Sequence, residues 1–239
     1  MNTNPSKPFF ARESVWMALI LILLGLRVAQ AALPNAEEVY HYREVTGKSV
    51  KTAEWRLRKA EGFTLTYTSP TQRHVTTTGP DYATRRWTVT ADSGQTDFTA
   101  ERIGRTIHLH GRFKGQAVDK DLAIDDAPWY QATSLSLRGF IASDDRTRVF
   151  WTIRYGTLSV HKIKAIKQGT EPVDPPDGRH ARMHIRLTLT GLLAPFWKSD
   201  YWFSLPDGIF QTFRGPSGPP GAPMTTICRL GDQENGCLY

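Results

Sequence analysis

The sequence of 239 residues contains only two cysteines, Cys228 and Cys237, and both lie near its C-terminus. Two cysteines in this position are too few for a zinc ribbon. In an oxidising compartment they can form a disulfide that closes a short loop and holds the end of the chain. We therefore predict a Cys228–Cys237 disulfide, with two free thiols in a frayed tail as the alternative.

The short motifs of catalysis and nucleotide binding are also missing. The chain has no G-x-S-x-G elbow, no P-loop, no G-x-G-x-x-G after a strand and no H-E-x-x-H. His108 and His110 share a face of a predicted strand and would suit zinc or copper, but nothing in the sequence brings a third ligand to them. Surface histidines are the simpler interpretation. We predict no catalytic residue, no metal and no cofactor.

No apolar run is long enough for a membrane span. Val15–Leu26 has twelve uncharged, mostly apolar residues, whereas a helix needs about twenty to cross a bilayer. The run follows Lys7 and Arg12 and precedes Ala29-Gln30-Ala31, a small-x-small cleavage pattern, which is typical of a secretory signal peptide. We predict that residues 1–31 are removed and leave no integral membrane domain.

The predicted signal places the mature protein, residues 32–239, in the periplasm. We predict that these residues form a single domain. The alternative is a membrane tether formed by an uncleaved N-terminal segment. The formal net charge is +7, and the basic residues are spread along the predicted strands instead of forming a run. This distribution predicts no nucleic-acid partner.

Period-2 alternation dominates the mature sequence. In "EVYHYREV", Tyr40, Tyr42 and Glu44 fall on one face, and in "RTIHLHGRF" Ile107 and Leu109 alternate with histidines. This pattern is typical of antiparallel strands with one face on a core and one in water. We count ten to twelve strands, with glycine-containing turns between several of them. A sheet of that width is expected to curl into a barrel or half-barrel.

One segment, "DDAPWYQATSLSLRGFIAS", breaks the alternation. Asp126 suits a helix cap, Pro128 suits the first turn, and the following apolar residues recur at roughly helical spacing. We predict a helix near 127–142 that covers the concave face of the sheet. A strand at Ser134–Ile141 is the alternative.

Aromatic side chains concentrate in the C-terminal half of the chain. Neighbouring aromatics on one strand point to opposite faces, so either both faces are covered or one face presents an apolar concavity. The first case is met by core packing under the helix and the second by a ligand pocket. For the pocket, the candidate ligand-binding residues are Trp129, Tyr130, Trp151, Trp197 and Trp202.

The segment "GPSGPPGAP", residues 215–223, has glycine at every third position but only three triplets, which excludes a collagen triple helix. Apolar, strand-like residues flank it on both sides. We predict an ordered connection between the last two strands.

Four sequence segments lie within Pro128–Leu230: "PWYQATSLSLRGF", "FWTIRYGTLSVHKIKAIKQGTE", "TLTGLLAPFWKSDYWFSLPDGIF" and "RGPSGPPGAPMTTICRL". Together they resemble a family of uncharacterised exported bacterial proteins of the DUF3108 type, from which this chain departs slightly at Ala222 and Met224. The resemblance implies an exported, mostly antiparallel β protein with no assigned activity. A looser architectural likeness is to periplasmic lipoprotein-carrier half-barrels, whose concave sheet holds acyl chains under a helical lid.

Three functions remain open from the sequence. The first is a non-enzymatic cell-envelope protein that binds a hydrophobic or amphipathic ligand, such as a lipid, in a curved sheet. The second is a structural or assembly factor with an envelope protein partner and no small ligand. The third is a metal-dependent hydrolase that uses His108 and His110.

Overall fold

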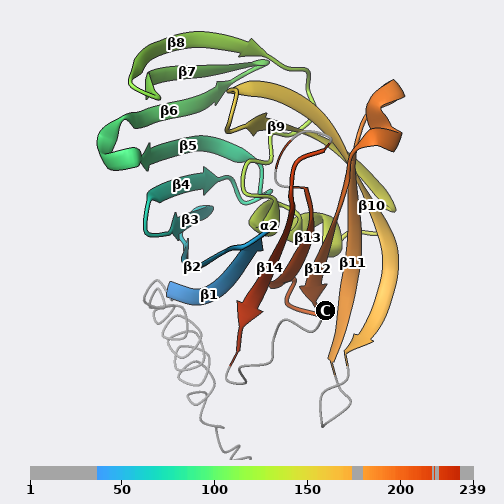
Figure 1. The fold of residues 1–239 in the computed structure, drawn as a ribbon. Helices are drawn as coiled ribbons and strands as arrows, with labels where there is room; N and C mark the ends of the chain where they lie inside the picture. Colours follow the sequence, from blue (N-terminus) through green and yellow to red (C-terminus); the bar gives the residue numbers. More distant parts are fainter. Residues whose placement is uncertain (1–36, 174–179, 217, 219–220, 232–239) are drawn as a thin grey trace, which may run out of the picture. The chain divides into compact units, whose positions relative to one another are not determined.

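Fourteen strands form one antiparallel sheet in the computed structural model, which describes residues 37–173, 180–216, 218 and 221–231 (Figure 1). The predicted β fold is confirmed, with fourteen strands in place of ten to twelve. The first eight are β1 (Glu37–Thr46), β2 (Ser49–Lys59), β3 (Phe63–Thr68), β4 (Gln72–Thr78), β5 (Thr84–Ala91), β6 (Thr96–Ile103), β7 (Thr106–Phe113) and β8 (Gln116–Ala123). The other six are β9 (Thr147–Arg154), β10 (Ser159–Val173), β11 (His180–Leu189), β12 (Lys198–Ser204), β13 (Phe210–Pro216) and β14 (Met224–Leu230).

The sheet consists of two meanders of consecutive hairpins joined side by side. The strand order is β8-β7-β6-β5-β4-β3-β2-β1-β14-β13-β12-β11-β10-β9. The hairpins are local; for example, Gly47 takes φ +56° in the turn between β1 and β2, a conformation that favours glycine. The meanders meet where β1 pairs with β14, from His41 opposite Leu230 to Thr46 opposite Thr225. We call this pairing the seam.

The sheet curls but does not close, and β8 and β9 remain its two end strands. Irregular register between Lys167 and Gly169 on β10 and between Trp202 and Phe203 on β12 marks two of the places where the ladder is interrupted. Such bulges bend a strand and increase its twist. Gly169 takes φ +140°, which favours glycine at this bulge.

The extended segment that follows β8 links β9, in the second meander, to β5, in the first. Trp129 forms a parallel bridge with Trp151 of β9, and the Trp129 carbonyl accepts a hydrogen bond of 2.8 Å from the Thr84 amide at the start of β5. The concave face is therefore bounded by this crossing segment as well as by the sheet.

The predicted covering helix is present but begins later than expected. Two short helices, α2 (Thr133–Ser136) and α3 (Arg138–Ile141), lie inside the curve of the sheet (Figure 1). Residues 127–132 are not helical, because the backbone on either side of Trp129 hydrogen-bonds to Trp151 of β9 and the Trp129 carbonyl accepts from Thr84 of β5. Asp126 is not a helix cap; its carboxylate pairs with Arg105.

Two apolar clusters hold the curl together. In the first, Leu137 and Phe140 of the helical segment, together with Tyr130 of the extended stretch before it, pack against Phe150 and Phe203 of the second meander. The second cluster joins β5–β7 to β9 and the turn that follows it; its buried members include Trp87, Phe98, Ile107, Leu109, Trp129, Ile153 and Leu158. Each fully buried side chain of this size contributes on the order of 2–3 kcal/mol.

Two short 3₁₀ segments, η1 (Asp92–Gly94) and η2 (Gly191–Phe196), complete the secondary structure of the described residues. The glycine- and proline-rich segment 215–223 joins β13 to β14, and its residues 217 and 219–220 lie outside the described residues. A Cβ atom on Gly215 would lie 2.4 Å from the Ser199 Cβ, so only glycine allows this approach of β13 to β12. No helix among the described residues has the length and hydropathy needed to cross a bilayer.

Candidate functional site

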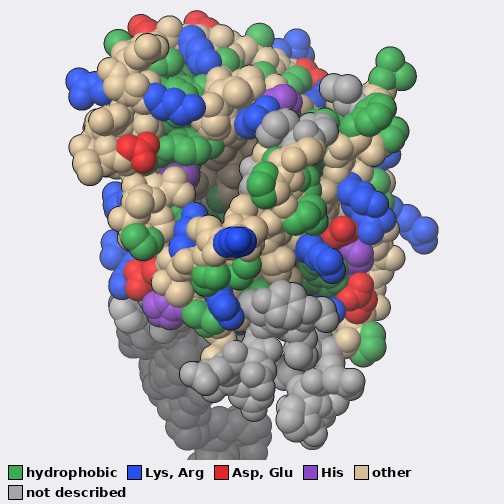
Figure 2. All heavy atoms as spheres, viewed as in Figure 1, with side chains coloured by type: hydrophobic (Ala, Val, Ile, Leu, Met, Phe, Trp, Pro, Cys, Tyr) green, Lys and Arg blue, Asp and Glu red, His purple; other side chains and the backbone are tan. Residues whose placement is uncertain are grey.

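Two cavities of about 500 Å³ each lie on the concave side of the sheet. They share the side chains of Gln131, Thr133 and Tyr201 as a common wall. The drawn face of the molecule is hollowed between β4–β5 and β13–β14 (Figure 2). Volumes of this size are in the range of small-molecule sites.

The first cavity, here called the ion-pair cavity, is built by the register of β1–β5 and β14. Glu44 lies directly opposite Lys51, and Trp55, Tyr67 and His74 follow one another across β2, β3 and β4. Its other lining residues are Thr46, Leu65, Thr76, Trp87, Ala132, Ser134, Phe210, Phe213, Thr225 and Ile227.

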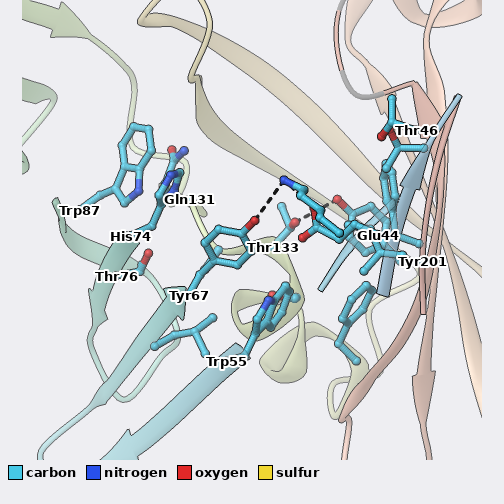
Figure 3. Close-up of a pocket in the computed structure, with 18 residues that line it drawn as sticks. Glu44, Thr46, Trp55, Tyr67, His74, Thr76, Trp87, Gln131, Thr133 and Tyr201 are labelled. Atoms are coloured by element: carbon cyan, nitrogen blue, oxygen red, sulfur yellow. Dashed lines mark hydrogen bonds and ion pairs between the residues drawn. The ribbon is translucent and has the colours of Figure 1, made fainter. Parts of the chain in front are cut away.

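The Glu44–Lys51 ion pair lies at the wall of this cavity. Lys51 Nζ is 2.8 Å from Glu44 Oε2, with 9% of the Glu44 side chain and 37% of the Lys51 side chain exposed. Lys51 Nζ also donates a hydrogen bond of 3.3 Å to Tyr67 Oη (Figure 3). Burial alone would lower the pKa of Lys51, but the hydrogen bond and charge of Glu44 outweigh it and raise this pKa. Lys51 is therefore a cation whose charge is matched by Glu44.

His74 completes the polar lining across from the ion pair. In Figure 3, His74 and Tyr67 lie on one side of the space and Glu44 lies on the other. The imidazole contacts the rings of Tyr67 at 5.4 Å and Trp87 at 5.7 Å between centroids. Burial, together with the charge of Lys51, lowers the pKa of His74 to about 4. The imidazole is therefore neutral at pH 7.

The second cavity, here called the apolar cavity, lies along β9–β13. Its walls are mostly apolar: Phe150, Ile153, Ile163, Leu187, Leu189, Phe196, Trp197, Tyr201 and Pro216. Cross-strand register aligns Phe150 with Ile163 and Ile163 with Leu189. These side chains form a continuous surface that suits the burial of an aliphatic chain.

One end of the apolar cavity is polar. Arg154, Thr152 and His161 line it there, with Thr152 opposite His161 and Arg154 opposite Ser159 on the β9–β10 pair. Burial, followed by the charge of Arg154, lowers the pKa of His161. The structure shows no ion pair or hydrogen bond for the Arg154 guanidinium within the described part of the chain.

The shared wall is held by its own hydrogen bonds. Gln131 exchanges two bonds of 3.0 Å with the backbone of Ile153 and accepts a third from Trp129 Nε1. Thr133 Oγ1 donates to Tyr201 Oη at 3.0 Å. Burial raises the pKa of Tyr201 to about 12, so its hydroxyl stays protonated.

The five residues predicted as ligand-binding do not all gather at one place, and of them Trp197 and Trp202 line a further cavity of about 460 Å³ together. Trp197 lines the apolar cavity and donates a hydrogen bond of 3.0 Å from Nε1 to the Gly218 carbonyl. Trp129 and Tyr130 are buried, with exposed fractions of 0% and 2%, in the second and first apolar clusters. Neither of them lines the two cavities on the concave side.

Trp151 and Trp202 are engaged in polar contacts elsewhere. Trp151 Nε1 donates to Asp125 Oδ1 at 2.7 Å, and the hydrogen bonds of Lys162 and then Trp151 hold the pKa of Asp125 well below its usual range. Trp202 stacks on His184 with centroids 4.7 Å apart and donates to Glu171 Oε2 at 2.9 Å. It lies on the face of β12 opposite Tyr201.

The two histidines of the metal hypothesis, His108 and His110, line neither concave cavity. His108 contacts Asp121 on an exposed surface, and no group of three or more metal-ligating side chains occurs among the residues that the structure describes. Cys228 is buried on β14. Its predicted disulfide partner, Cys237, and the predicted signal, residues 1–31, lie outside the described residues.

The sequence interpretation missed Glu44, Lys51, His74 and Arg154. A signal for Glu44 was present, because the alternation places this acid on the same face as Tyr40 and Tyr42, which are buried. No such signal marks Arg154, since basic residues occur on both faces of the predicted strands.

Comparison with known proteins supports the fold. No model of a known protein family matches the sequence, and no curated protein matches it. The structure is similar to a β-barrel-like protein of the domain of unknown function DUF1849 from Brucella abortus, with a TM-score of 0.56 and 8% identity over 84% of this chain and 100% of that one. The fold is barrel-like. At this identity the likeness concerns the fold alone.

A LolA superfamily protein from Nitrosomonas europaea also matches, with a TM-score of 0.27, 7% identity, and coverage of 83% of this chain and 86% of that one. This second likeness is too loose to carry an argument. The resemblance in sequence to the DUF3108 type stays a prediction, because no family match accompanies it.

Proposed function

We propose that the protein binds a hydrophobic or amphipathic ligand, such as a lipid chain, inside its curved sheet, and that it does so without catalysing a reaction. The apolar cavity is the observation that carries this proposal. Its volume of about 500 Å³ and its aligned Phe150, Ile163 and Leu189 side chains suit an aliphatic chain. Burial of such a chain would contribute about 0.8 kcal/mol for each methylene removed from water.

Native mass spectrometry of protein purified from its own host tests this proposal. A bound ligand is expected as a discrete added mass that is lost after organic extraction. Leu189→Trp, which fills the apolar cavity, should abolish the added mass. Thr188→Trp is the matched control, because Thr188 is the neighbour of Leu189 on β11 and points to the opposite face. Retention of the ligand by Leu189→Trp would contradict the proposal.

We further propose that the protein works in the periplasm after export. The support is the signal-like N-terminus, with its short apolar run and Ala29-Gln30-Ala31. Cell fractionation and the intact mass of the purified protein test this. Loss of residues 1–31 is the expected result, and a full-length, membrane-associated chain would instead favour the tether.

A second candidate, an assembly factor with a protein partner, is favoured by two side chains on η2. Leu192 is 94% exposed and Phe196 is 66% exposed on the same short segment, and exposed apolar side chains that lie together favour a contact surface more than isolated ones do. Leu192→Ser should then abolish co-purification of an envelope partner. Because Leu192 does not line the apolar cavity, this variant leaves ligand binding unchanged and separates the two functions.

A further inference from the structure

We propose that the apolar cavity takes a single-chain amphiphile with an anionic head, a carboxylate or a phosphate, and that the Arg154 guanidinium binds this head. This inference rests on the proposed function, because it names the class of ligand for the same cavity. It is carried by the arrangement of cation and apolar surface along β9 and β10.

The alternation of β9 places Phe150, Thr152 and Arg154 on one face. Phe150 and Arg154 are four residues apart, which is about 13 Å along a strand. The apolar wall therefore passes into a polar end along a single strand, as an amphiphile passes from chain to head.

Arg154 is the cation at this end, and no carboxylate of the described residues neutralises it. No ion pair joins Arg154 to any acidic residue of the described chain; Asp125, for example, is paired with Lys162. Of the described residues that line the apolar cavity, none is acidic. A guanidinium stays charged at any physiological pH and binds carboxylates and phosphates in a bidentate manner.

His161 supports the same assignment. It lies opposite Thr152 and diagonally across from Arg154 on the same face, and Ser159 Oγ lies 3.1 Å from His161 Nε2. Because no described acid pairs with this imidazole either, the described residues of the polar end present one uncompensated positive charge together with neutral hydrogen-bonding groups. An anionic head completes this set, whereas a cationic head would meet repulsion from Arg154.

The ion-pair cavity does not offer an equivalent site. Its cation, Lys51, lies 2.8 Å from Glu44, so an anion there would compete with a carboxylate already in place. The proposal therefore assigns the head to Arg154 and not to Lys51.

Two probes of equal chain length test the inference on delipidated full-length protein: tetradecanoate, which is anionic, and 1-monomyristoylglycerol, which is neutral. Calorimetric titration is expected to show tetradecanoate binding at least about tenfold more tightly, since hydrogen bonds to charged groups are the stronger ones. Arg154→Gln should remove this preference and leave the affinity for monomyristoylglycerol within about twofold. Arg154→Lys should keep part of the preference.

The matched control is Arg112→Gln, which removes one positive charge from an exposed position on β7 and should leave both affinities unchanged. An unchanged preference for tetradecanoate in Arg154→Gln overturns the inference. Equal binding of both probes to the unsubstituted protein also overturns it but leaves the proposed function standing. Failure of both probes to bind contradicts the proposed function itself.

Discussion

Among the described residues, each of the two concave cavities has one Lys or Arg in its lining, and these two cations differ in how their charge is compensated. Lys51 lies within 2.8 Å of Glu44, whereas Arg154 has no acidic neighbour among the described residues that line its cavity. In the first cavity the protein supplies both charges, so the pair belongs to the architecture. In the second only one charge is supplied, and the missing one is expected to come from outside.

The walls of the two cavities also differ in the interactions that stabilise them. The apolar cavity is formed by packing, with Phe150 fully buried and Ile163 and Leu187 nearly so. The ion-pair cavity is formed by an ion pair and by His74, whose protonation depends on pH. We therefore expect the two cavities to respond to different perturbations.

The largest effect is expected from Phe150→Ala, which removes a side chain with 0% exposure from the wall of the apolar cavity. The loss of burial and the enlarged void should lower the free energy of unfolding by about 3–5 kcal/mol. Urea unfolding measures this change. Phe196→Ala, in the same wall but 66% exposed, should cost less than about 1 kcal/mol. Equal losses would show that packing does not distinguish these positions.

Acidification should destabilise the ion-pair cavity through His74. Its folded pKa of about 4 lies below the value of 6.5 for an exposed imidazole, so between these two pH values the unfolded chain binds a proton that the folded chain does not. Stability is therefore fully present above pH 6.5 and is lost as the pH falls toward 4, by at most about 3 kcal/mol. Urea unfolding across this window should show a shallower pH dependence in His74→Phe. An identical slope would contradict the assignment.

Replacing Lys51 and replacing Glu44 should lower the free energy of unfolding by different amounts. Lys51→Met leaves the nearly buried Glu44 carboxylate unpaired and should lower the free energy of unfolding by about 2 kcal/mol, below the cost at a fully buried pair because Lys51 is one-third exposed. Glu44→Gln leaves a cation that still reaches water, and less than about 1 kcal/mol is expected. The double variant Glu44→Gln/Lys51→Met should recover part of the loss. A larger loss of stability in Glu44→Gln than in Lys51→Met would contradict the argument that the more buried partner is the costlier one to leave unpaired.

Glu44→Gln also tests the role of charge compensation in a binding experiment. It makes Lys51 an uncompensated cation in an aromatic cavity, as Arg154 is in the apolar one. We expect a second, weaker equivalent of tetradecanoate to bind to this variant, detectable by calorimetry as an increased stoichiometry. An unchanged stoichiometry would mean that charge compensation does not separate the two cavities.

The smallest effect is expected on the other face of β12. Trp202→Phe removes the hydrogen bond to Glu171, whose side chain is 39% exposed, and should cost about 0.5 kcal/mol. Because Trp202 lines neither concave cavity, tetradecanoate affinity is expected to stay unchanged. A loss of affinity would place the ligand on the other face of the sheet.

The sequence predicted the fold more fully than the site. Period-2 alternation is set by each strand alone, so the antiparallel sheet was predicted and is confirmed. The concave-face helix was predicted from the helical spacing of one segment, and helices are present there. The start of the helix was wrong by about six residues, because the capping signal at Asp126 is local while the backbone partners of Trp129 come from distant strands. Whether a tryptophan side chain lines a cavity or packs in an apolar cluster likewise depends on strands that are distant in the sequence.

The charged residues of the two cavities illustrate the same limit. A two-residue turn at Gly47 aligns Glu44 with Lys51, so this pair follows from the hairpin register and could have been derived from the sequence. Whether an acidic side chain lies near Arg154 depends on which residues the curvature of the whole sheet brings close to it. No local sequence pattern predicts these neighbours.

The seam between β1 and β14 has a consequence for the order of folding. Every other strand pairing of the described sheet joins neighbours along the chain, and such contacts form quickly because little loop entropy is lost. Glu44 lies on β1 and faces Ile227 of β14, whereas the strands of the apolar cavity all belong to the second meander. We expect the ion-pair cavity to form last, when the two ends of the folded chain meet.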